Sequence, residues 1–397
     1  MKLFTQLVAV SSISLRGLPQ RLRPSLVIVI GTAGVVAVLL SVLALSTGLA
    51  GALTATGSPD RAIVLHAQAA NEVGSNLPHD YIPTIMDSPF IARDSNHKPI
   101  ASAEALSSVN LPQLDNGKLS ALTMRGVNTE QLLALRPEMH IVQGRLFRPG
   151  LRELIAGRSA HDRYANLGVG NQVKFGDNVW TVVGIFDSGG GAHDSEVMGD
   201  IDTVLAAYQR TTYNSVIVKL DGPKGFDNLH AALLHDPTLS VQVFKESDYY
   251  ARQSQTFASF LALIAKVIST IMAIGAVFAA LNTMYSAVSA RAVEIATLRA
   301  IGFGATGVVT SVIIEALVLS VLGALVGAAL AWAVFDGNTV SSLAGNGGLA
   351  QVVFHLHIGA ALITLGIIWA CVVGLIGGLL PAVRAARIPV ALALRAI

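Results

Sequence analysis

The sequence has 397 residues, of which 52% are hydrophobic and only 13% charged, and its formal net charge is +2. Soluble globular chains carry roughly 25% charged residues, so this composition argues against an ordinary soluble protein and predicts a membrane protein. No basic run interleaved with aromatic residues occurs, and the single cysteine, Cys371, excludes an intrachain disulfide.

The chain begins with residues 1–24, which combine leucine and valine with four basic residues and no acidic one. This pattern predicts an amphipathic segment along the inner membrane surface, with its arginines near anionic headgroups. No charged residue occurs between Ser25 and Pro59, and the apolar run there exceeds the ~20 residues that cross a bilayer. A signal peptide has an apolar region of only ~7–15 residues, so we expect residues 25–53 to be an uncleaved first span.

Residues 54–254 alternate short β-like runs with turn signals, which predicts a large α+β domain outside the membrane. A short helix is expected at residues 229–235, and residues 247–256 should begin the helix that enters the second span. The predicted strands are residues 61–65, 153–157, 172–175, 179–186, 213–220 and 240–244, with a hairpin turn at Gly176-Asp177-Asn178.

Three further charge-poor windows follow, and each is long enough to cross a bilayer. The second is broken only by Lys266, which can snorkel to the interface. Together they predict a stalk and second span at 255–290, a cytoplasmic helix at 291–302, a third span at 303–335, an outer loop at 336–357, a fourth span at 358–380 and a tail at 381–397.

The orientation follows from the Lys and Arg residues near the ends of these spans, because positive residues concentrate on the cytoplasmic side. Residues 336–357 contain neither Lys nor Arg. Both termini are therefore expected in the cytoplasm, with residues 54–254 outside. The basic residues that set this orientation are Lys2, Arg16, Arg21, Arg23, Arg291, Arg299, Arg384, Arg387 and Arg395.

Among the polar residues inside the predicted spans, Asn282 and Glu315 are candidates for a specific intramembrane role. A carboxyl inside a span costs roughly 2.5–3.5 kcal/mol on insertion scales and normally faces the protein interior. Glu315 is either a proton-relay or substrate contact, or a hydrogen-bonding group between packed helices, with Asn282 or Ser311 as partner. We favour the second interpretation.

Glycines in the last two spans have the spacing of closely packed helices, Gly323 and Gly327 in the third and Gly374, Gly377 and Gly378 in the fourth. The spacing leaves open whether the contact lies within one subunit or across a dimer.

No motif in the chain predicts catalysis. Gly117-Lys118 lacks the remaining residues of a phosphate-binding loop, so ATP hydrolysis by that chemistry is excluded. His193, Asp194 and Ser195 are adjacent, but catalytic triads are assembled in space and not by adjacency. The acidic residues around them do not fit a calcium loop and are expected in a solvated loop. His355 and His357 lack the further ligands of a metal site, so we expect an interfacial role.

Residues 291–302 form a short charged segment between two apolar windows. On a helix, Arg291, Glu294, Ile295, Leu298 and Gly302 share one stripe, and Arg291 can pair with Glu294. The string R-x-x-E-I-A-T-L-R-A-I-G, from Arg291 to Gly302, resembles the coupling segment of MacB/FtsX-type permeases of ABC transporters. The stretch Pro381 to Arg395 is similar to the closing motif of that family.

The resemblance implies a permease subunit with four transmembrane helices and a MacB-like outer domain that contains a β-rich insert at about 153–210. It implies that the ATPase-coupling residues are Arg291, Glu294, Ile295, Leu298, Arg299 and Gly302. In this family, two permease chains, expected here to be a homodimer, pair with two ABC ATP-binding subunits. These subunits hold ATP and Mg, so no cofactor is expected in this chain and it is not expected to be an enzyme.

The expected location is the bacterial inner (plasma) membrane, with membrane lipids and a periplasmic adaptor, the membrane fusion protein, as further partners and no nucleic acid. The family implies that ATP-driven motion passes to the outer domain for export. The alternative is an FtsX-like scaffold that activates a cell-wall hydrolase. The large outer domain favours export.

Overall fold

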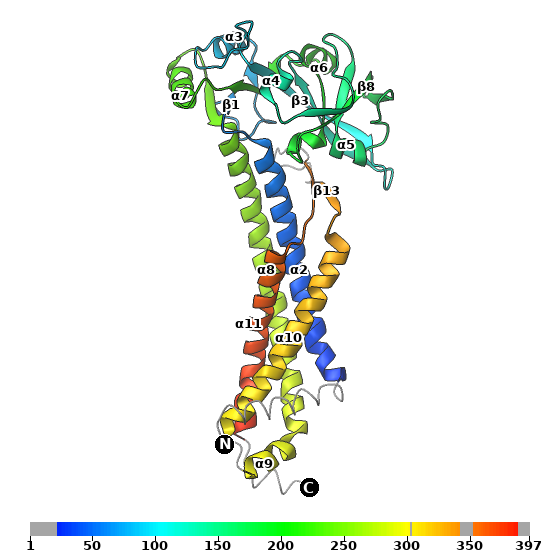
Figure 1. The fold of residues 1–397 in the computed structure, drawn as a ribbon, viewed down its shortest axis with the longest axis vertical. Helices are drawn as coiled ribbons and strands as arrows, with labels where there is room; N and C mark the ends of the chain where they lie inside the picture. Colours follow the sequence, from blue (N-terminus) through cyan, green and yellow to red (C-terminus); the bar gives the residue numbers. More distant parts are fainter. Residues whose placement is uncertain (1–21, 302–303, 342–351, 388–397) are drawn as a thin grey trace. The chain divides into compact units, whose positions relative to one another are not determined.

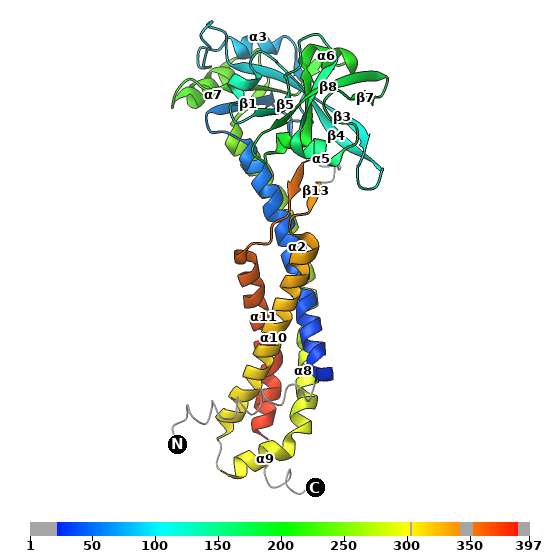
Figure 2. The same cartoon turned by 45° about the vertical axis from the view of Figure 1, so that its right-hand side comes forward.

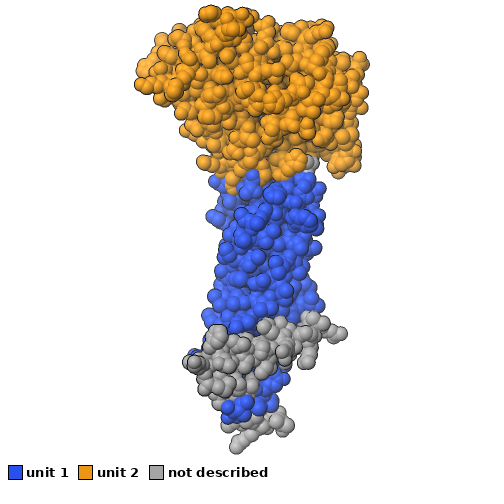
Figure 3. Space-filling model, in the orientation of Figure 1, with its two compact units in different colours: residues 1–47, 259–338, 356–397 blue, residues 48–258, 339–355 orange. Residues whose placement is uncertain are grey.

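The computed structural model describes residues 22–301, 304–341 and 352–387. The chain divides into two compact units, which Figure 3 colours separately: residues 1–47, 259–338 and 356–397 form one, and residues 48–258 and 339–355 the other. Most of the predicted surface segment (1–24), Gly302 and the end of the tail lie outside the described residues.

Long helices build the first unit (Figure 1). Four helices in the described parts of the chain are long and apolar enough to cross a membrane, and they fall on the four predicted spans. The short helix α9 (Ala292–Ala300) follows the second of them, where the charged segment was predicted. The long helices are α2 (Leu22–Thr56), α8 (Glu246–Ala290), α10 (Ala305–Phe335) and α11 (Ala360–Ala386).

Small residues allow these helices to approach closely. A Cβ atom built on Gly323 of α10 would lie 2.7 Å from the Val29 backbone oxygen of α2. On α11, a Cβ built on Gly378 would lie 2.7 Å from the Ala316 Cβ of α10. Gly323 and Gly378 therefore allow close contacts between helices of the same chain.

The second unit contains a ten-stranded mixed sheet with short helices around it (Figure 2). Its strands follow the order β12-β1-β11-β3-β4-β9-β6-β8-β5, and β7 pairs with β8. Their bounds are β1 (Arg61–His66), β3 (Ala101–Pro112), β4 (Leu119–Val127), β5 (His140–Gly144), β6 (Glu153–Gly157), β7 (Gln172–Phe175), β8 (Asn178–Asp187), β9 (Glu196–Asp200), β11 (Ser215–Lys219) and β12 (Val241–Lys245).

The remaining elements are short. The helices are α3 (Tyr81–Met86), α4 (Leu132–Leu135), α5 (Arg158–Arg163), η2 (Ala192–Ser195), α6 (Ile201–Ala207) and α7 (Gly225–His235). Two small ribbons pair β2 (Leu77–Pro78) with β10 (Thr212–Tyr213), and β13 (Thr339–Ser341) with β14 (Val353–His355).

Strand β3 belongs to both halves of the sheet. Residues 101–104 pair with β11, and residues 105–112 pair with β4. The first half of the sheet shares a core with α3 and α7, which includes Ile85 and Leu229. The second half buries Trp180 of β8 in a separate core with α5 and α6. A third core, which includes Phe147 and Phe186, lies in the same unit, so the twelve-residue strand β3 connects halves of the sheet with separate cores.

Five of the six predicted strands of this unit appear in the structure with ends shifted by no more than one residue, whereas the predicted strand 213–220 is divided into β10 and β11, which belong to different sheets. The hairpin is also confirmed: Phe175 pairs with Asn178 across Gly176-Asp177, and Gly176 has a φ of 59°, which suits glycine. The predicted insert, about 153–210, holds β6 to β9. Strands β4 and β5, which precede it, lie in the same half of the sheet.

Candidate functional site

The predicted coupling segment folds as α9, a nine-residue helix for which Arg291 is the N-cap residue. The chain leaves α8 at Ala290 and turns immediately. In this turn the Arg291 amide donates a hydrogen bond to the Val288 carbonyl at 3.2 Å. The segment is thus a separate short helix and not a continuation of α8.

The N-cap side chain turns toward α10. Arg291 Nη1 donates to Glu315 Oε2 at 3.0 Å, and the two side chains are only 13% and 7% exposed. The predicted pair between Arg291 and Glu294 is also present, at 3.6 Å, but Glu294 is 67% exposed. The stronger partner of Arg291 is therefore the carboxylate inside α10, since a buried charge-assisted bond is worth more than a solvated pair.

Two further contacts hold α9 against the other helices of its unit. Ile295 is buried in a core that includes Met284 of α8 and Val312 of α10. Near the end of α9, Arg299 Nη1 donates to the Ala386 carbonyl at 2.8 Å. Ala386 is the last residue of α11, where carbonyl groups lack intrahelical partners and attract a cation.

The opposite face of α9 is exposed. It presents Val293, Glu294, Thr297 and, just beyond the helix, Ile301, which is 69% exposed. This face thus offers one charged, one hydroxyl and two apolar side chains to a protein partner. Sequence reasoning placed Ile295 on this surface because periodicity does not say which face a neighbouring helix covers.

The other predicted site residues are placed as follows. Of the two partners suggested for Glu315, Asn282 of α8 is exposed on its unit, whereas Ser311 is buried on α10. For Leu298 the structure describes only the backbone, which lies within α9. Gly302 lies outside the described residues.

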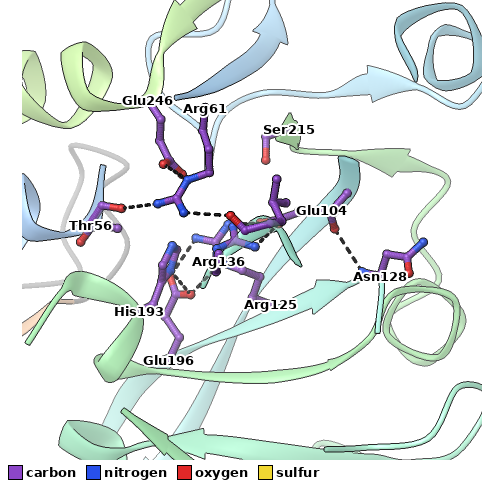
Figure 4. Close-up of polar contacts among 12 residues, drawn as sticks. Thr56, Arg61, Glu104, Arg125, Asn128, Arg136, His193, Glu196, Ser215 and Glu246 are labelled. Carbon is purple, nitrogen blue, oxygen red and sulfur yellow. Dashed lines mark hydrogen bonds and ion pairs between the residues drawn. The ribbon is translucent and has the colours of Figure 1, made fainter. Parts of the chain in front are cut away.

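A second feature was not predicted: a cluster of buried charged side chains in the α+β unit (Figure 4). Arg125 of β4 binds three buried carboxylates: Glu72 and Glu104 at 2.7 Å each, and Glu196 at 2.6 Å. Arg136 also binds Glu104, at 2.8 Å. The bonded pairs lie 21 to 71 residues apart in sequence, so no local spacing could have indicated the cluster.

These contacts shift the ionisation of the carboxyl groups. Burial alone would raise the pKa of Glu196, but the charge of Arg125, assisted by His193, holds that pKa well below its usual value. Burial likewise opposes ionisation of Glu104, and the charges of Arg136 and Arg125 lower its pKa. Both groups therefore remain carboxylates at neutral pH.

An adjoining ion pair joins the beginnings of β1 and α8. Arg61 Nε donates to Glu246 Oε2 at 2.5 Å, and both side chains are buried. The same carboxylate oxygen accepts the Ser58 amide at 3.0 Å, and the Thr56 carbonyl at the end of α2 accepts from Arg61 Nη2 at 3.2 Å. Arg61 thus bonds both to the last residue of α2 and to the first residue of α8.

The segment with His193, Asp194 and Ser195 differs from the expected solvated loop. All three side chains are buried, because the segment forms η2 against the sheet. His193 Nδ1 bonds Glu196 at 3.0 Å, and Ser195 Oγ bonds the Val353 backbone amide at 2.7 Å. The histidine and the serine therefore bind different partners and do not form a triad.

Asp194 binds the glycine-rich loop beside η2. Its carboxylate accepts the Ser188 amide at 2.6 Å and the Gly190 amide at 2.8 Å. Burial raises the pKa of Asp194, against the lowering effect of these hydrogen bonds. The acidic residues of this segment thus have structural partners, and in the described ranges no three His, Cys, Asp or Glu side chains group as metal ligands.

His357 lies beside α10's end, with Nδ1 3.2 Å from Asp336 Oδ1, and its side chain is 81% exposed. That position fits the interfacial role expected for it.

Four apolar helices of membrane-crossing length, a short charged helix after the second, and a separately packed α+β unit point to a membrane protein with a folded domain outside the membrane. Residues 25–235 match the MacB-like periplasmic core domain, which covers more than half of the chain, and residues 266–390 match the FtsX-like permease C-terminal domain. The chain therefore belongs to the MacB/FtsX-type permease family of ABC transporters, and the resemblance read from the two sequence motifs is confirmed.

Several solved structures resemble part of the chain. The extracellular domain of the noncanonic ABC-type transporter YknZ from Gram-positive bacteria is 16% identical, with TM-score 0.35, and the match covers 46% of this chain and 99% of that one. The periplasmic region of MacB from Actinobacillus actinomycetemcomitans is 16% identical, with TM-score 0.38 and coverage of 51% and 94%.

A domain of a putative permease from Porphyromonas gingivalis is 13% identical, with TM-score 0.30 and coverage of 47% and 87%. No curated protein matches the chain.

Proposed function

We propose that this chain is the permease subunit of an ABC transporter and passes the motion of a separate ATPase to its extracytoplasmic domain. The observation that carries this proposal is the exposed face of α9, with Glu294 67% exposed at its centre. The match to the FtsX-like permease domain includes this helix. Family membership supplies the expected partner, an ABC ATP-binding subunit that holds ATP and Mg.

In the proposed assembly, two permease chains and two ATPase subunits come together in the bacterial inner (plasma) membrane. Both termini and α9 face the cytoplasm, and the α+β unit faces outward, where an adaptor protein would meet it. The ATPase binds Val293, Glu294, Thr297 and Ile301. Arg291 and Ile295, which the sequence analysis placed on the ATPase-coupling surface, are not in this set because both are engaged within their own unit.

ATP-driven closure of the two ATPases would displace α9, and α2 and α8 would carry the motion outward. Export is the favoured outcome because the α+β unit is large. The signalling alternative uses the same coupling step, so a test of α9 addresses the step that both functions share.

The test reverses one charge on the exposed face. In the Glu294→Lys variant, we expect affinity for the ATPase subunit to fall by at least about tenfold, since a tenfold change needs only ~1.4 kcal/mol. The measurement is titration of purified permease with an ABC ATP-binding subunit from the same organism, together with stimulated ATP hydrolysis.

The matched control is Glu130→Lys, which reverses an equally exposed carboxylate that pairs with Lys98 on the α+β unit. It should leave binding unchanged. Equal binding by the native chain and the Glu294→Lys variant would refute the assigned surface, and no binding by the native chain would refute the proposed function.

A further inference from the structure

The ion pair between Arg291 and Glu315 connects the start of α9 to the inside of α10. The two residues are 24 positions apart, and the bond joins Nη1 to Oε2 at 3.0 Å. Glu315 lies ten residues beyond the first residue of α10, which corresponds to about 15 Å along the helix axis. Arg291 therefore reaches from the end of α8 to a carboxylate well inside the neighbouring helix.

The environment of the pair makes the bond strong. Glu315 is 5% exposed, and its neighbours on the same face, Val312, Ala316 and Leu319, belong to a buried apolar core. A carboxylate in such surroundings is costly unless a cation and hydrogen bonds compensate it. The ion pair is therefore maintained, and it keeps the Arg291 guanidinium bound to α10.

The position of Arg291 gives the bond a mechanical consequence. Arg291 is the N-cap residue of α9, so fixing its side chain fixes the point at which α9 begins. Ile295 is buried one turn later, and Arg299 bonds the Ala386 carbonyl two turns later. The helix is thus attached at its start, middle and end, while Glu294 and Thr297 on the other face remain exposed.

We propose that Glu315 is a positioning residue: through Arg291 it fixes α9 on α10, so that displacement of α9 moves α10 instead of rotating α9 in place. This inference rests on the proposed function. It separates two tasks within one short helix, because the exposed face binds the ATPase and the buried face transmits the displacement.

The test compares Glu315→Gln with the charge exchange Arg291→Glu/Glu315→Arg. Glu315→Gln should leave ATPase affinity within about threefold of native and lower the stimulation of ATP hydrolysis by at least about tenfold, because the docking face is intact and the attachment is lost. The charge exchange should restore a substantial part of the stimulation. Ser320→Ala, which changes a buried neutral polar residue of the same helix, is the control and should behave as native.

A second measurement does not depend on the ATPase. Amide hydrogen exchange over residues 292–300 should be at least about tenfold faster in Glu315→Gln than in the native chain or in Ser320→Ala, because local opening of α9 costs less without the ion pair. This readout also identifies a variant that is unfolded as a whole, since exchange in the α+β unit would then rise as well.

Native stimulation together with native exchange in Glu315→Gln would overturn the inference. Loss of ATPase affinity in a variant whose α9 exchanges normally would also overturn it, because Glu315 would then shape the docking face itself. If the native chain binds no ATPase but amide exchange in α9 is still faster in Glu315→Gln, the proposed function is refuted. The attachment of α9 through the ion pair would then still be supported.

Discussion

Arg125 illustrates how single side chains organise the α+β unit. Its guanidinium binds three carboxylates from separate parts of the chain, and all four groups are buried. Breaking such a cluster by removing one partner costs roughly 3–5 kcal/mol, because uncompensated charge is then left in the interior. The lowered pKa values of Glu104 and Glu196 link this cluster to the ionised form of both carboxyls, which makes the unit sensitive to acid.

The first prediction concerns this sensitivity. The pKa of Glu196 is lowered in the folded chain, whereas an unfolded glutamate titrates near ~4.3. The stabilisation is therefore present above about pH 4.3 and is lost as the pH falls below it. Glu104, whose pKa is also lowered, acts in the same direction, and Asp194, whose pKa is raised, offsets part of the loss.

Between pH 6 and pH 3.5, we expect the melting temperature of the α+β unit to fall by roughly 4 °C or more. Fluorescence of the buried Trp180 reports this melting temperature. Because the sequence has three tryptophans, the measurement uses a Trp332→Phe/Trp369→Phe background in which Trp180 alone remains. Glu196→Gln is the control: it should be less stable at pH 6 and show a shallower pH dependence. A native profile that is flat over this range would contradict the prediction.

Residue-scale features were the least predictable part of the molecule. The sequence identified Glu315 as a buried polar group, but its partner Arg291 is 24 residues away and is decided by how α9 turns back against α10. The acidic residues around His193 and Ser195 were likewise expected in a solvated loop, whereas the contacts of these two residues with Glu196 and Val353 depend on the assembled sheet. Local spacing carries no information about such long-range pairs.

At the scale of elements, the crossing of α10 with α2 depends on glycine. The Cβ of an alanine at position 327 would overlap the Ala33 backbone oxygen, and neither backbone can yield without separating the helices. At Gly275 of α8, by contrast, an added Cβ meets no atom within 4 Å.

The second prediction follows from this difference. Gly327→Ala should lower the free energy of unfolding by about 1–3 kcal/mol, because the helices must move apart to admit the methyl group. Gly275→Ala should be neutral or slightly stabilising, since alanine favours the helix. Thermal unfolding of the full chain in detergent measures both, and equal melting temperatures for the two variants would show that the α2–α10 contact tolerates a side chain.

The long helices themselves were predictable because each comes from a window with few charges, and charge cannot be hidden in a bilayer. The strands from 172 to 187 were predictable from alternation and a two-residue turn. Strand β3 was not predicted: its sequence is rich in alanine and serine and includes Glu104, whose burial depends on Arg125 and Arg136. A pattern of apolar and polar residues cannot reveal a strand whose inward side chain is charged.

At the scale of the whole molecule, the third prediction concerns the sidedness of the membrane. In a Cys371→Ala background, an impermeant maleimide should label a Ser95→Cys variant in intact cells, because Ser95 is exposed on the α+β unit. A Thr297→Cys variant, on the exposed face of α9, should be labelled only after the membrane is permeabilised. Labelling of both positions from outside would place α9 on the wrong side for an ATPase and would refute the proposed function.

The shared strand β3 also limits how the extracytoplasmic unit can act. Its first residues hydrogen-bond to β11 and its last to β4, so one continuous strand joins the two halves of the sheet. Closure of these halves on a ligand, as in hinged binding proteins, would have to bend this strand where its pairing changes, between Glu104 and Ala105.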